Sequence, residues 1–370
     1  MKKTFLPLAA FAFISLILMS WGYEGHYKIN TNASLSYNED MNQFLEWTSS
    51  LAEHASDADN RKGDDPEEGH KHYIDIDYYP EFVADGRIAS TWDSVVDKHG
   101  ENFVNDNGIL PWATLASYDT LRSCFERRDW EKAKLTAADL GHYVADGHMP
   151  LHICKNYNGQ LTGNTGIHSR YESTMINAHI NDINYDGRSI AIIQDVPGYI
   201  FSYLYDSYQY VDSVIIADDY ATEIAGDTKS SNYTNALWDR TKGFTGKLFS
   251  DASHSLAELI YSAWVEAGSP QINTSSLYAP VIQKGASLSQ NNPNPFTGTT
   301  RINYSLSGKA NVTLEVRDVS GSRIATIDHG LKAGGDYHVS WSPDDQPAGI
   351  YYLVLNTGTA CQVKKMIKIE

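Results

Sequence analysis

Apolar residues recur at helical spacing through most of the first 270 residues. Tryptophan, leucine and phenylalanine follow one another at roughly that spacing over residues 112–125, and Pro111 suits the first turn of a helix, where its missing N–H is harmless. A second helix is predicted over Trp130–Gly147, because Pro150 interrupts the pattern just beyond it. We therefore expect residues 21–272 to form a mainly α-helical domain. Two later segments continue the helical pattern: Ile192–Val211 and Phe244–Ala267.

The pattern changes after Gly268. Residues 269–298 are rich in Ser, Asn, Pro and Gly, which interrupt regular elements, so residues 273–290 are predicted to be a linker. Beyond it, apolar and polar residues alternate in short segments separated by turns, which predicts a small all-β sandwich over residues 291–370. The predicted strands are Arg301–Leu306, Val312–Val316, Arg323–Ile327, Tyr337–Trp341, Ile350–Leu355 and Val363–Ile369.

Residues 1–20 are interpreted as a secretory signal peptide. Two lysines precede the apolar stretch Phe5–Met19, which is short for a membrane-spanning helix, and no comparable run occurs later. A membrane anchor is the alternative. Cleavage after residue 20 would leave Trp21 as the first mature residue, and a cut beside Gly22 competes with it.

Composition and net charge limit the classes of function that the chain can have. The chain has 370 residues, 42% of them hydrophobic, which is enough for two domains with a substantial core. Its formal charge of −17 argues against general adhesion to nucleic-acid backbone or to anionic membranes, because both would repel such a surface. Three cysteines are too few for a disulfide framework. A Cys124–Cys154 bridge and buried free thiols both remain open.

Histidines and carboxylates are paired at helical spacing in two places. His142 and Asp146 are four residues apart, so on a helix they lie on one face and can hold one metal ion with little extra ordering. His168 and Glu172 repeat this spacing, and His152 lies between the two pairs. Zinc suits mixed imidazole and carboxylate ligands. The alternative is a buried polar network without metal.

Five segments of the first domain resemble a known family. They are similar to motifs of the zinc-dependent phospholipases C and the related fungal single-strand-specific nucleases, which are mainly helical and bind three zinc ions. The resemblance runs from residue 21 to about residue 172, and the later helices are compatible with it. The segments are Trp21–His26, Asp57–Lys62, His72–Asp75, His142–His152 and His168–Glu172.

The resemblance implies three zinc ions held by residues that match the family's motifs. Asp59 is also expected to orient or deprotonate the attacking water, as a catalytic residue. Asp57, only two residues away, is the alternative at that position. The implied ligands are Asp59, His72, His142 and Asp146 for the first ion, His152, His168 and Glu172 for the second, and the α-amine and carbonyl of Trp21, His26 and a bridging Asp146 for the third.

This ligand chemistry fits hydrolysis of a phosphodiester. Adjacent zinc ions lower the pKa of a shared water towards 7 and neutralise charge on phosphoryl oxygens. An acidic chain would otherwise repel a phosphodiester, so the metals are expected to supply the attraction.

Three features resemble the phospholipases more than the nucleases. The last ligand is Glu172, where the phospholipases use Glu and the nucleases typically use Asp. Fifteen residues lie between His152 and His168, close to the short phospholipase loop. Glu24 lies fourth from the predicted mature terminus, where the phospholipases place an acid that meets the choline cation.

Other positions depart from the phospholipase pattern. Asn60 and Gly69 do not match the remaining headgroup positions, so choline specificity is not implied. Tyr73 resembles the aromatic residue that follows the metal-binding histidine in the nucleases, where it can stack on a base. Its alternative role is ordinary core packing.

The tail resembles the type A sorting domain of the type IX secretion system of Bacteroidetes. Four segments carry this resemblance: the Asn-Pro-Asn-Pro-Phe opening at 292–296, the turn Asp318–Gly321, Pro347–Tyr352 and the closing strand Lys364–Ile369. It implies a protein that crosses the inner membrane by its signal peptide and then reaches the cell surface or the medium through the type IX machinery. A carbohydrate-binding or adhesive sandwich is the alternative.

Three hypotheses follow for the whole chain. The first is a secreted zinc-dependent phosphodiesterase of the phospholipase C type, acting on phospholipid headgroups. The second is a single-strand-specific nuclease or 3′-nucleotidase, and the third is a non-catalytic surface protein with a structural metal site. Catalytic zinc keeps a coordination position open for water, which separates the first two from the third. No stable protein partner is indicated apart from the secretion machinery.

Overall fold

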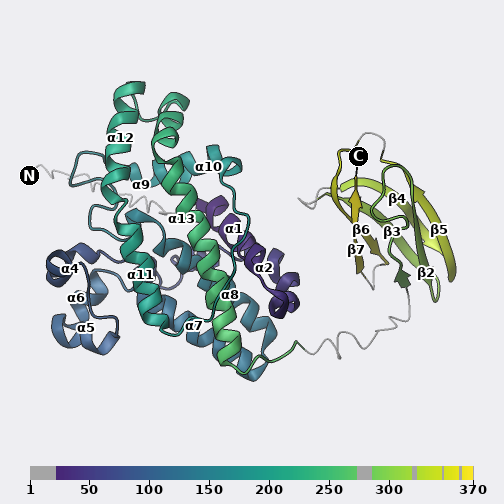
Figure 1. Cartoon of the computed structure of the whole chain (residues 1–370), viewed down its shortest axis with the longest axis horizontal. Coiled ribbons are helices and arrows are strands. Elements are labelled where there is room, and N and C mark those ends of the chain that lie inside the picture. Colours follow the sequence, from purple (N-terminus) through teal and green to yellow (C-terminus); the bar gives the residue numbers. More distant parts are fainter. Residues whose placement is uncertain (1–21, 273–285, 319–322, 344–345, 358–360, 370) are drawn as a thin grey trace, which may run out of the picture. The chain divides into compact units, whose positions relative to one another are not determined.

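The computed structural model describes residues 22–272, 286–318, 323–343, 346–357 and 361–369. The chain divides into two compact units, one up to Ile272 and one from Asn273 onwards. The first is mainly helical and the second is built from strands (Figure 1). No helix among the described residues is long and apolar enough to cross a membrane. The predicted signal peptide lies outside the described residues.

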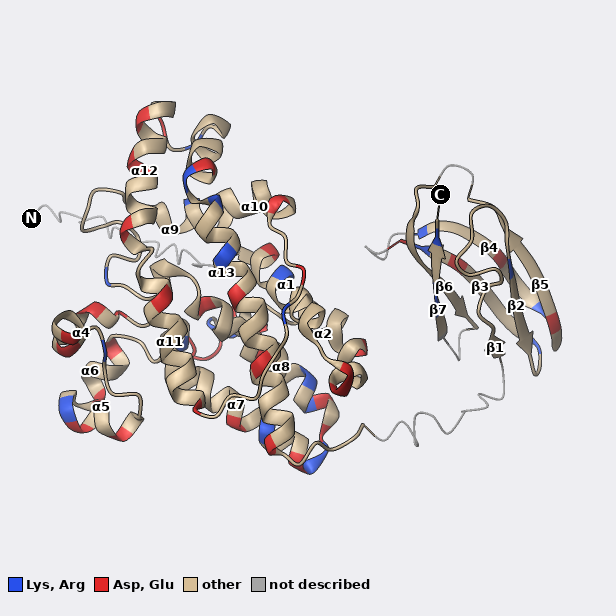
Figure 2. Cartoon of the chain, in the orientation of Figure 1, with Lys and Arg blue, Asp and Glu red and all other residues tan. Residues whose placement is uncertain are grey.

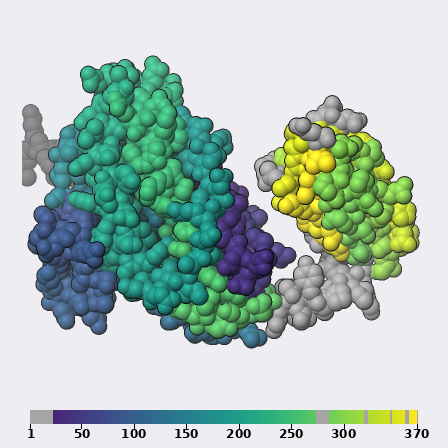
Figure 3. All heavy atoms as spheres, in the orientation of Figure 1, coloured from purple at the N-terminus to yellow at the C-terminus, as the bar shows by residue number. Residues whose placement is uncertain are grey.

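The helical unit contains long helices joined by short helical turns. Asp and Glu residues occur on most of its helices, in keeping with the acidic composition (Figure 2). Residues 196–266, coloured teal to green, cover the middle of the face of the helical unit seen in Figure 3. The α-helices are α1 (Gly22–Ala33), α2 (Thr48–Glu53), α3 (Asp57–Arg61), α4 (Pro80–Asp85), α5 (Trp92–His99), α6 (Glu101–Asp106), α7 (Leu110–Arg127), α8 (Trp130–Gly147), α9 (Ile167–Ser169), α10 (Ile176–His179), α11 (Val196–Tyr208), α12 (Val211–Ala225) and α13 (Ser231–Glu266).

The other turns of the helical unit are tighter or wider than an α-helix. One is a π-helix, labelled η6 (Arg170–Met175), which follows α9 without a break. The rest are 3₁₀ turns: η1 (Ser34–Ser36), η2 (Glu39–Trp47), η3 (Gly69–His72), η4 (Ile76–Tyr78), η5 (Pro150–His152) and η7 (Ile180–Asp182).

Helix α8 lies at the centre of the unit and has the predicted bounds. The Asp129 side chain accepts from the Lys132 N–H at 3.4 Å and caps the first turn. Residues 140–147 are all buried, so the C-terminal half of α8 is enclosed on every side. Helix α7 places Pro111 in its first turn, as predicted.

Two predicted helices have different starting points in the structure. Residues 192–195 are not helical, because the Ile193 N–H donates to Ser262 Oγ at 2.9 Å and Pro197 favours a helix start just before it. Helix α13 starts at Ser231, earlier than the predicted Phe244. The Ser230 side chain caps this start by accepting from the Tyr233 N–H at 3.3 Å.

Helices α1 and α8 approach closely because position 141 is a glycine. A Cβ atom at Gly141 would lie 2.2 Å from Asn30 Oδ1, so any other residue would push the helices apart. Asn30 is fully buried, and its Nδ2 donates to the carbonyls of Leu51 at 2.9 Å and Ala138 at 3.2 Å. This amide therefore joins α1, α2 and α8 in the interior of the unit.

The second unit is a sandwich of two antiparallel sheets, with strand orders β1-β2-β5 and β4-β3-β6-β7. Its interior contains fully buried Ile302, Leu314 and Leu353, one from each of three strands. The strands are β1 (Ala286–Leu288), β2 (Thr300–Leu306), β3 (Ala310–Arg317), β4 (Arg323–Lys332), β5 (Gly335–Trp341), β6 (Gly349–Asn356) and β7 (Cys361–Lys368).

The predicted linker boundary at residue 290 is wrong. Strand β1 lies inside the segment predicted to be a linker and pairs with β2, with Ser287 opposite Ser305. With only three residues, β1 is too short for alternation to reveal it in the sequence. The sandwich therefore begins at Ala286 among the described residues.

Gly141→Ala should destabilise the helical unit by about 1–3 kcal/mol, because the added methyl group overlaps Asn30 in a packed interior. Gly243→Ala is the matched control. Position 243 is exposed within α13 with open space around it, so alanine should stabilise by about 0.5–1 kcal/mol. Urea-induced unfolding of the two variants measures both effects. A Gly141→Ala protein as stable as the wild type would contradict the close approach of α1 and α8.

Candidate metal centre

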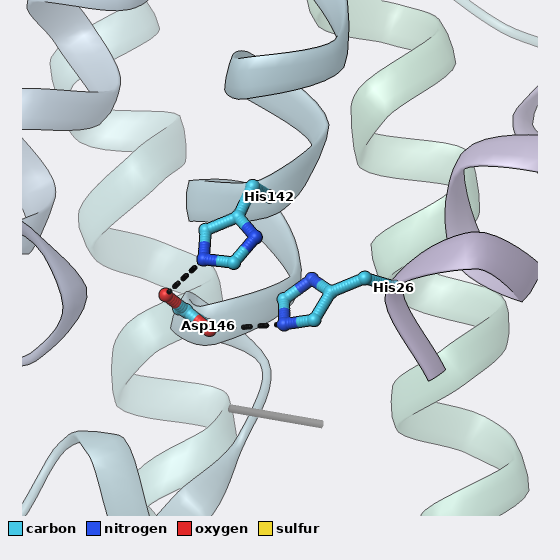
Figure 4. A group of neighbouring side chains, drawn as sticks. All are labelled: His26, His142 and Asp146. Atoms are coloured by element: carbon cyan, nitrogen blue, oxygen red, sulfur yellow. Dashed lines mark ion pairs between the residues drawn. The ribbon is translucent and has the colours of Figure 1, made fainter. Parts of the chain in front are cut away.

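The carboxylate of Asp146 lies at the middle of a group of histidines. Asp146 is fully buried in the last turn of α8. One of its oxygens, Oδ2, lies 2.9 Å from His72 Nδ1 and 3.3 Å from His142 Nε2. The other, Oδ1, lies 3.5 Å from His26 Nε2 and 3.5 Å from His152 Nδ1. Figure 4 shows His26 on α1 and His142 on α8 pointing at this carboxylate from two sides.

The first group of possible metal ligands contains Asp59, His72 and His142. Asp59 Oδ1 lies 3.6 Å from His72 Nδ1 and 3.7 Å from His142 Nε2, and the two nitrogens are 2.9 Å apart. These three residues are buried and could hold one ion. Asp146 adjoins the group through its Oδ2. The structure thus brings together all four residues that the sequence assigns to the first zinc.

The second group contains His152, His168 and Glu172. Glu172 Oε2 lies 3.4 Å from His152 Nε2, and its Oε1 lies 3.1 Å from His168 Nε2. His168 belongs to α9 and Glu172 to the π-helix η6, so this pair does not lie on a regular α-helix as predicted. The four-residue spacing nevertheless brings both side chains to one place, and π-helical turns are frequent at functional sites.

The third group contains His26, His142 and Asp146. The imidazole rings of His26 and His142 stack with centroids 4.0 Å apart and planes 11° apart. This contact follows from the close approach of α1 and α8, because His26 precedes Asn30 by one turn and His142 adjoins Gly141. The predicted terminal ligand Trp21 lies outside the described residues.

Main-chain carbonyl groups orient three of the histidines. In each, Nδ1 lies within hydrogen-bond distance of a carbonyl, which can only accept, so Nδ1 carries the proton. Nε2 is then the nitrogen that faces the carboxylates, which leaves it as the atom of each ring that can bind a metal. The pairs are His142 with Ala55 at 2.7 Å, His152 with His72 at 2.6 Å, and His168 with Tyr157 at 3.0 Å.

A main-chain pairing joins the first group to the second. The Ile74 N–H donates to the His152 carbonyl at 2.8 Å, while His152 Nδ1 donates back to the carbonyl of His72. The Ile76 N–H adds a longer bond to the Ile153 carbonyl at 3.4 Å. The segments around His72 and His152 are therefore held side by side by their backbones.

The structure distinguishes Asp59 from Asp57. Asp57 pairs with His54 at 2.7 Å, and both side chains are about 40% exposed at the surface of the unit. Asp59 is only 5% exposed, and its Oδ1 accepts from Lys62 Nζ at 2.6 Å. Geometry therefore places Asp59, and not Asp57, beside the histidines.

The two predicted substrate-binding residues lie outside the three groups. Glu24 is exposed in the first turn of α1, two residues before His26. Tyr73 is partly buried, and its hydroxyl lies 3.3 Å from the Asp106 carbonyl and 3.4 Å from His70 Nδ1. Burial and the nearby Asp75 raise the pKa of Tyr73, so it stays a neutral phenol at neutral pH.

Electrostatics within the centre favour ionised carboxylates. Burial alone would raise the pKa of Asp146, but His142 and His152 outweigh it and hold that pKa well below its usual range. Burial alone would lower the pKa of His142, but Asp146 and Asp59 raise it to about 9. Burial and the neighbouring His142 lower the pKa of His26 to about 3. The centre thus combines anionic oxygens with at least one neutral imidazole.

Two buried atoms of the candidate ligands are better explained by a bound metal ion than by a hydrogen-bonded network without metal. Asp59 Oδ2 and His152 Nε2 are buried, and neither makes a hydrogen bond within the described part of the chain. A network without metal would leave these groups unsatisfied, which costs about 1–3 kcal/mol each. Both belong to groups with the carboxylate and imidazole donors that suit zinc.

Sequence reasoning missed Glu68. It is 1% exposed, and its carboxylate contacts Tyr143 Oη, Lys71 Nζ at 2.8 Å and Arg61 Nη2 at 3.5 Å. Burial would raise its pKa, but interactions with His72, Lys71 and Tyr143 hold the pKa below its usual range. The sequence signal that could have revealed Glu68 was its position four residues before His72.

Cys124 and Cys154 are buried free thiols. Burial, with Asp77 and Asp75 nearby, raises the pKa of Cys154, so it is a neutral thiol. The bridge that the sequence left open is therefore absent between these two described residues.

Comparisons with known proteins match the two units differently. Residues 289–360 match the family model of the FlgD Ig-like domain. This covers most of the β-sandwich and shows an Ig-like domain there, while the sorting role stays a prediction. A search of curated proteins found no significant match.

Two solved structures resemble the chain over most of its length. The alpha-toxin of Clostridium absonum is 10% identical, with a TM-score of 0.42 over 94% of this chain and 96% of the toxin. The alpha-toxin of Clostridium perfringens from avian strain SWCP is 9% identical, with a TM-score of 0.43 over 93% of this chain and 97% of the toxin.

Proposed function

We propose that this chain is a secreted, three-zinc phosphodiesterase, with phospholipase C activity preferred and single-strand-specific nuclease activity as the alternative. The observation that carries the proposal is the convergence of three groups of buried His, Asp and Glu side chains around the carboxylate of Asp146. Such a concentration of metal-binding side chains in one interior is difficult to explain by fold stability alone, because unpaired buried charge is costly.

The ligand assignments follow from the three groups. Asp59, His72, His142 and Asp146 would hold the first ion, and His152, His168 and Glu172 the second. His26 and Asp146 would contribute to the third, completed by the α-amine and carbonyl of Trp21. When bound, zinc would supply a Lewis acid for the phosphoryl oxygens and a water of lowered pKa.

The protein's own residues supply orientation and proton transfer. Asp59 is proposed as the general base, since its Oδ2 makes no hydrogen bond within the described chain while Lys62 holds its Oδ1 at 2.6 Å. Lys62 also brings a positive charge to the edge of the centre. An anionic phosphodiester would meet this charge in an otherwise acidic protein.

The choice of phospholipid over nucleic acid rests on sequence resemblance, above all on Glu172 and its spacing from His152. Partly buried Tyr73, next to His72, is the observation that keeps the nuclease alternative open, since an aromatic ring there could stack on a base. The test is hydrolysis of phosphatidylcholine and of single-stranded DNA, side by side, by the zinc-loaded chain beginning at Trp21. Activity on neither substrate, with zinc bound, would support a non-catalytic metal protein instead.

The β-sandwich is proposed to direct export. Its Ig-like character is compatible with the sorting-domain resemblance of the tail. In this proposal the helical unit reaches the cell surface or the medium through the type IX machinery, after the signal peptide has directed the chain into the periplasm.

Asp59→Asn should remove at least one of the three zinc ions and lower phosphodiesterase activity by about 100-fold or more, because the variant loses an anionic ligand and the general base. Asp57→Asn is the matched control: the same chemical change, two residues away, at an exposed pair with His54. Elemental analysis and initial rates measure both effects. Equal zinc content in the two variants would contradict the assignment of Asp59.

The zinc-depleted protein should lose stability as the pH rises from about 7 to about 9.5. The folded-state pKa of His142 is raised to about 9, so the stability from its protonated form is present below its ordinary pKa of 6.5 and is lost as the pH passes through about 9. Zinc-loaded protein should not show this loss, because the metal replaces the proton. Thermal unfolding across this pH range tests it. An equally steep decline in depleted His142→Gln would exclude His142 as the cause.

Deleting residues 286–370 should abolish export in a host that carries the type IX machinery. The truncated chain should collect in the periplasm with its phosphodiesterase activity intact, since the sandwich is a separate compact unit. Activity in medium, surface and periplasmic fractions measures the effect. Normal amounts of truncated protein in the medium would contradict the sorting role.

A further inference from the structure

His72 is oriented differently from the histidines that bond to main-chain carbonyls. It turns Nδ1 towards the first group, where this nitrogen lies 2.9 Å from Asp146 Oδ2 and 2.9 Å from His142 Nε2. Its outward nitrogen, Nε2, is buried and makes no hydrogen bond within the described residues, and the Glu68 carboxylate faces it, with 3.5 Å between Nε2 and Oε1. Glu68 therefore occupies, beside His72, the place that a main-chain carbonyl group occupies beside His142, His152 and His168.

The surroundings of Glu68 leave it only one role towards His72. Its contacts are the Tyr143 hydroxyl, the Lys71 ammonium group and the Arg61 guanidinium group, all of them hydrogen-bond donors. An ionised carboxylate can only accept hydrogen bonds. If a metal ion takes the Nδ1 lone pair of His72, the ring would keep its proton on Nε2, and Glu68 is the carboxylate that lies beside that nitrogen to accept it.

Glu68 is held in place by the same elements that carry the ligands. It precedes the 3₁₀ turn Gly69–His72, so the four-residue separation brings its carboxylate to the outer edge of the imidazole. Tyr143 follows His142 on α8, and Arg61 also pairs with Asp139 of α8 at 3.1 Å. The carboxylate is thus fixed relative to the helix that supplies His142 and Asp146.

We propose that Glu68 is a positioning residue of the metal centre, which accepts the Nε2–H of His72 and keeps the Nδ1 lone pair aimed at the ion shared with Asp59, His142 and Asp146. This inference rests on the proposed function, because it requires a metal ion at that place. Glu68 acts through His72, since it belongs to none of the three groups that could hold an ion. A carboxylate partner also makes the imidazole a more basic, stronger ligand.

Glu68→Gln tests the proposal in the full chain beginning at Trp21. Glutamine has the same shape but no charge, so zinc affinity, measured by competition with a chromophoric chelator, should fall by about 10- to 100-fold. Glu258→Gln is the matched control. Glu258 is likewise buried and accepts from Tyr199 Oη at 2.7 Å and the Ala191 N–H at 2.9 Å, but it contacts none of the three ligand groups. Both variants should lose thermal stability, and only Glu68→Gln should lose zinc affinity.

The outcomes separate this inference from the proposed function. A wild-type chain that binds no zinc overturns the proposed function and this inference with it. A wild-type chain that binds zinc, with Glu68→Gln within about threefold of Glu258→Gln in affinity, overturns the positioning role alone.

A second measurement tests the proposed orientation of His72 even if Glu68→Gln does not fold. Long-range nitrogen–proton NMR of the zinc-loaded wild type should show His72 protonated at Nε2 and His142, His152 and His168 protonated at Nδ1. A His72 ring protonated at Nδ1 would overturn the proposal.

Discussion

The structure of the helical unit depends on keeping one buried carboxylate, Asp146, in its ionised form. Moving an isolated carboxylate from water into a protein interior costs several kcal/mol, so such a group must be surrounded by compensating partners. Asp146 obtains them from four histidines on α1, η3, α8 and η5. Segments far apart in the sequence therefore converge on the last turn of α8.

Two neighbouring faces of helix α8 contribute residues to the metal centre. His142 and Asp146 face the ligand groups, while Asp139 and Tyr143 hold Arg61 and Glu68 on the neighbouring side. Gly141 lets α1 approach closely enough for His26 to stack on His142. The C-terminal half of α8 thus carries candidate metal ligands, a residue that contacts Glu68, and the glycine at which α1 packs closely. Neighbouring segments therefore cover this half of the helix, and its residues from 140 to 147 are all buried.

Two pairs of the centre could be predicted from the sequence because their information is local, whereas Asp59, His72 and His26 were implied by the resemblance to a family. Pairs at four-residue spacing, such as His142 with Asp146, bring their side chains together through helix geometry alone. The end of α8 also followed from a local signal, Pro150, while the capping side chain of Asp129 at its start was a signal that the prediction did not use. The same spacing held for His168 and Glu172, although the turn that carries Glu172 is a π-helix.

What the sequence did not reveal depends on contacts between distant segments. The pairing of Asn30 with Ala138 spans 108 positions, and Gly141, which fits against Asn30, lies farther still along the chain. The importance of Glu68 depends on Tyr143 and Arg61 closing around it, which no local pattern encodes. Strand β1 is defined by its pairing with β2 and by little in its own three residues.

The backbone pairing between the segments of His72 and His152 has a consequence for the centre as a whole. The Ile74 N–H donates to the His152 carbonyl, and the imidazole Nδ1 of His152 donates to the carbonyl of His72, so the two segments that carry ligands of the first and second groups are tied together. Neither segment can shift without taking the other with it. The separation between the two groups is consequently set by main-chain geometry, and side-chain rotation can change it little. We therefore expect local unfolding at either segment to disturb both groups.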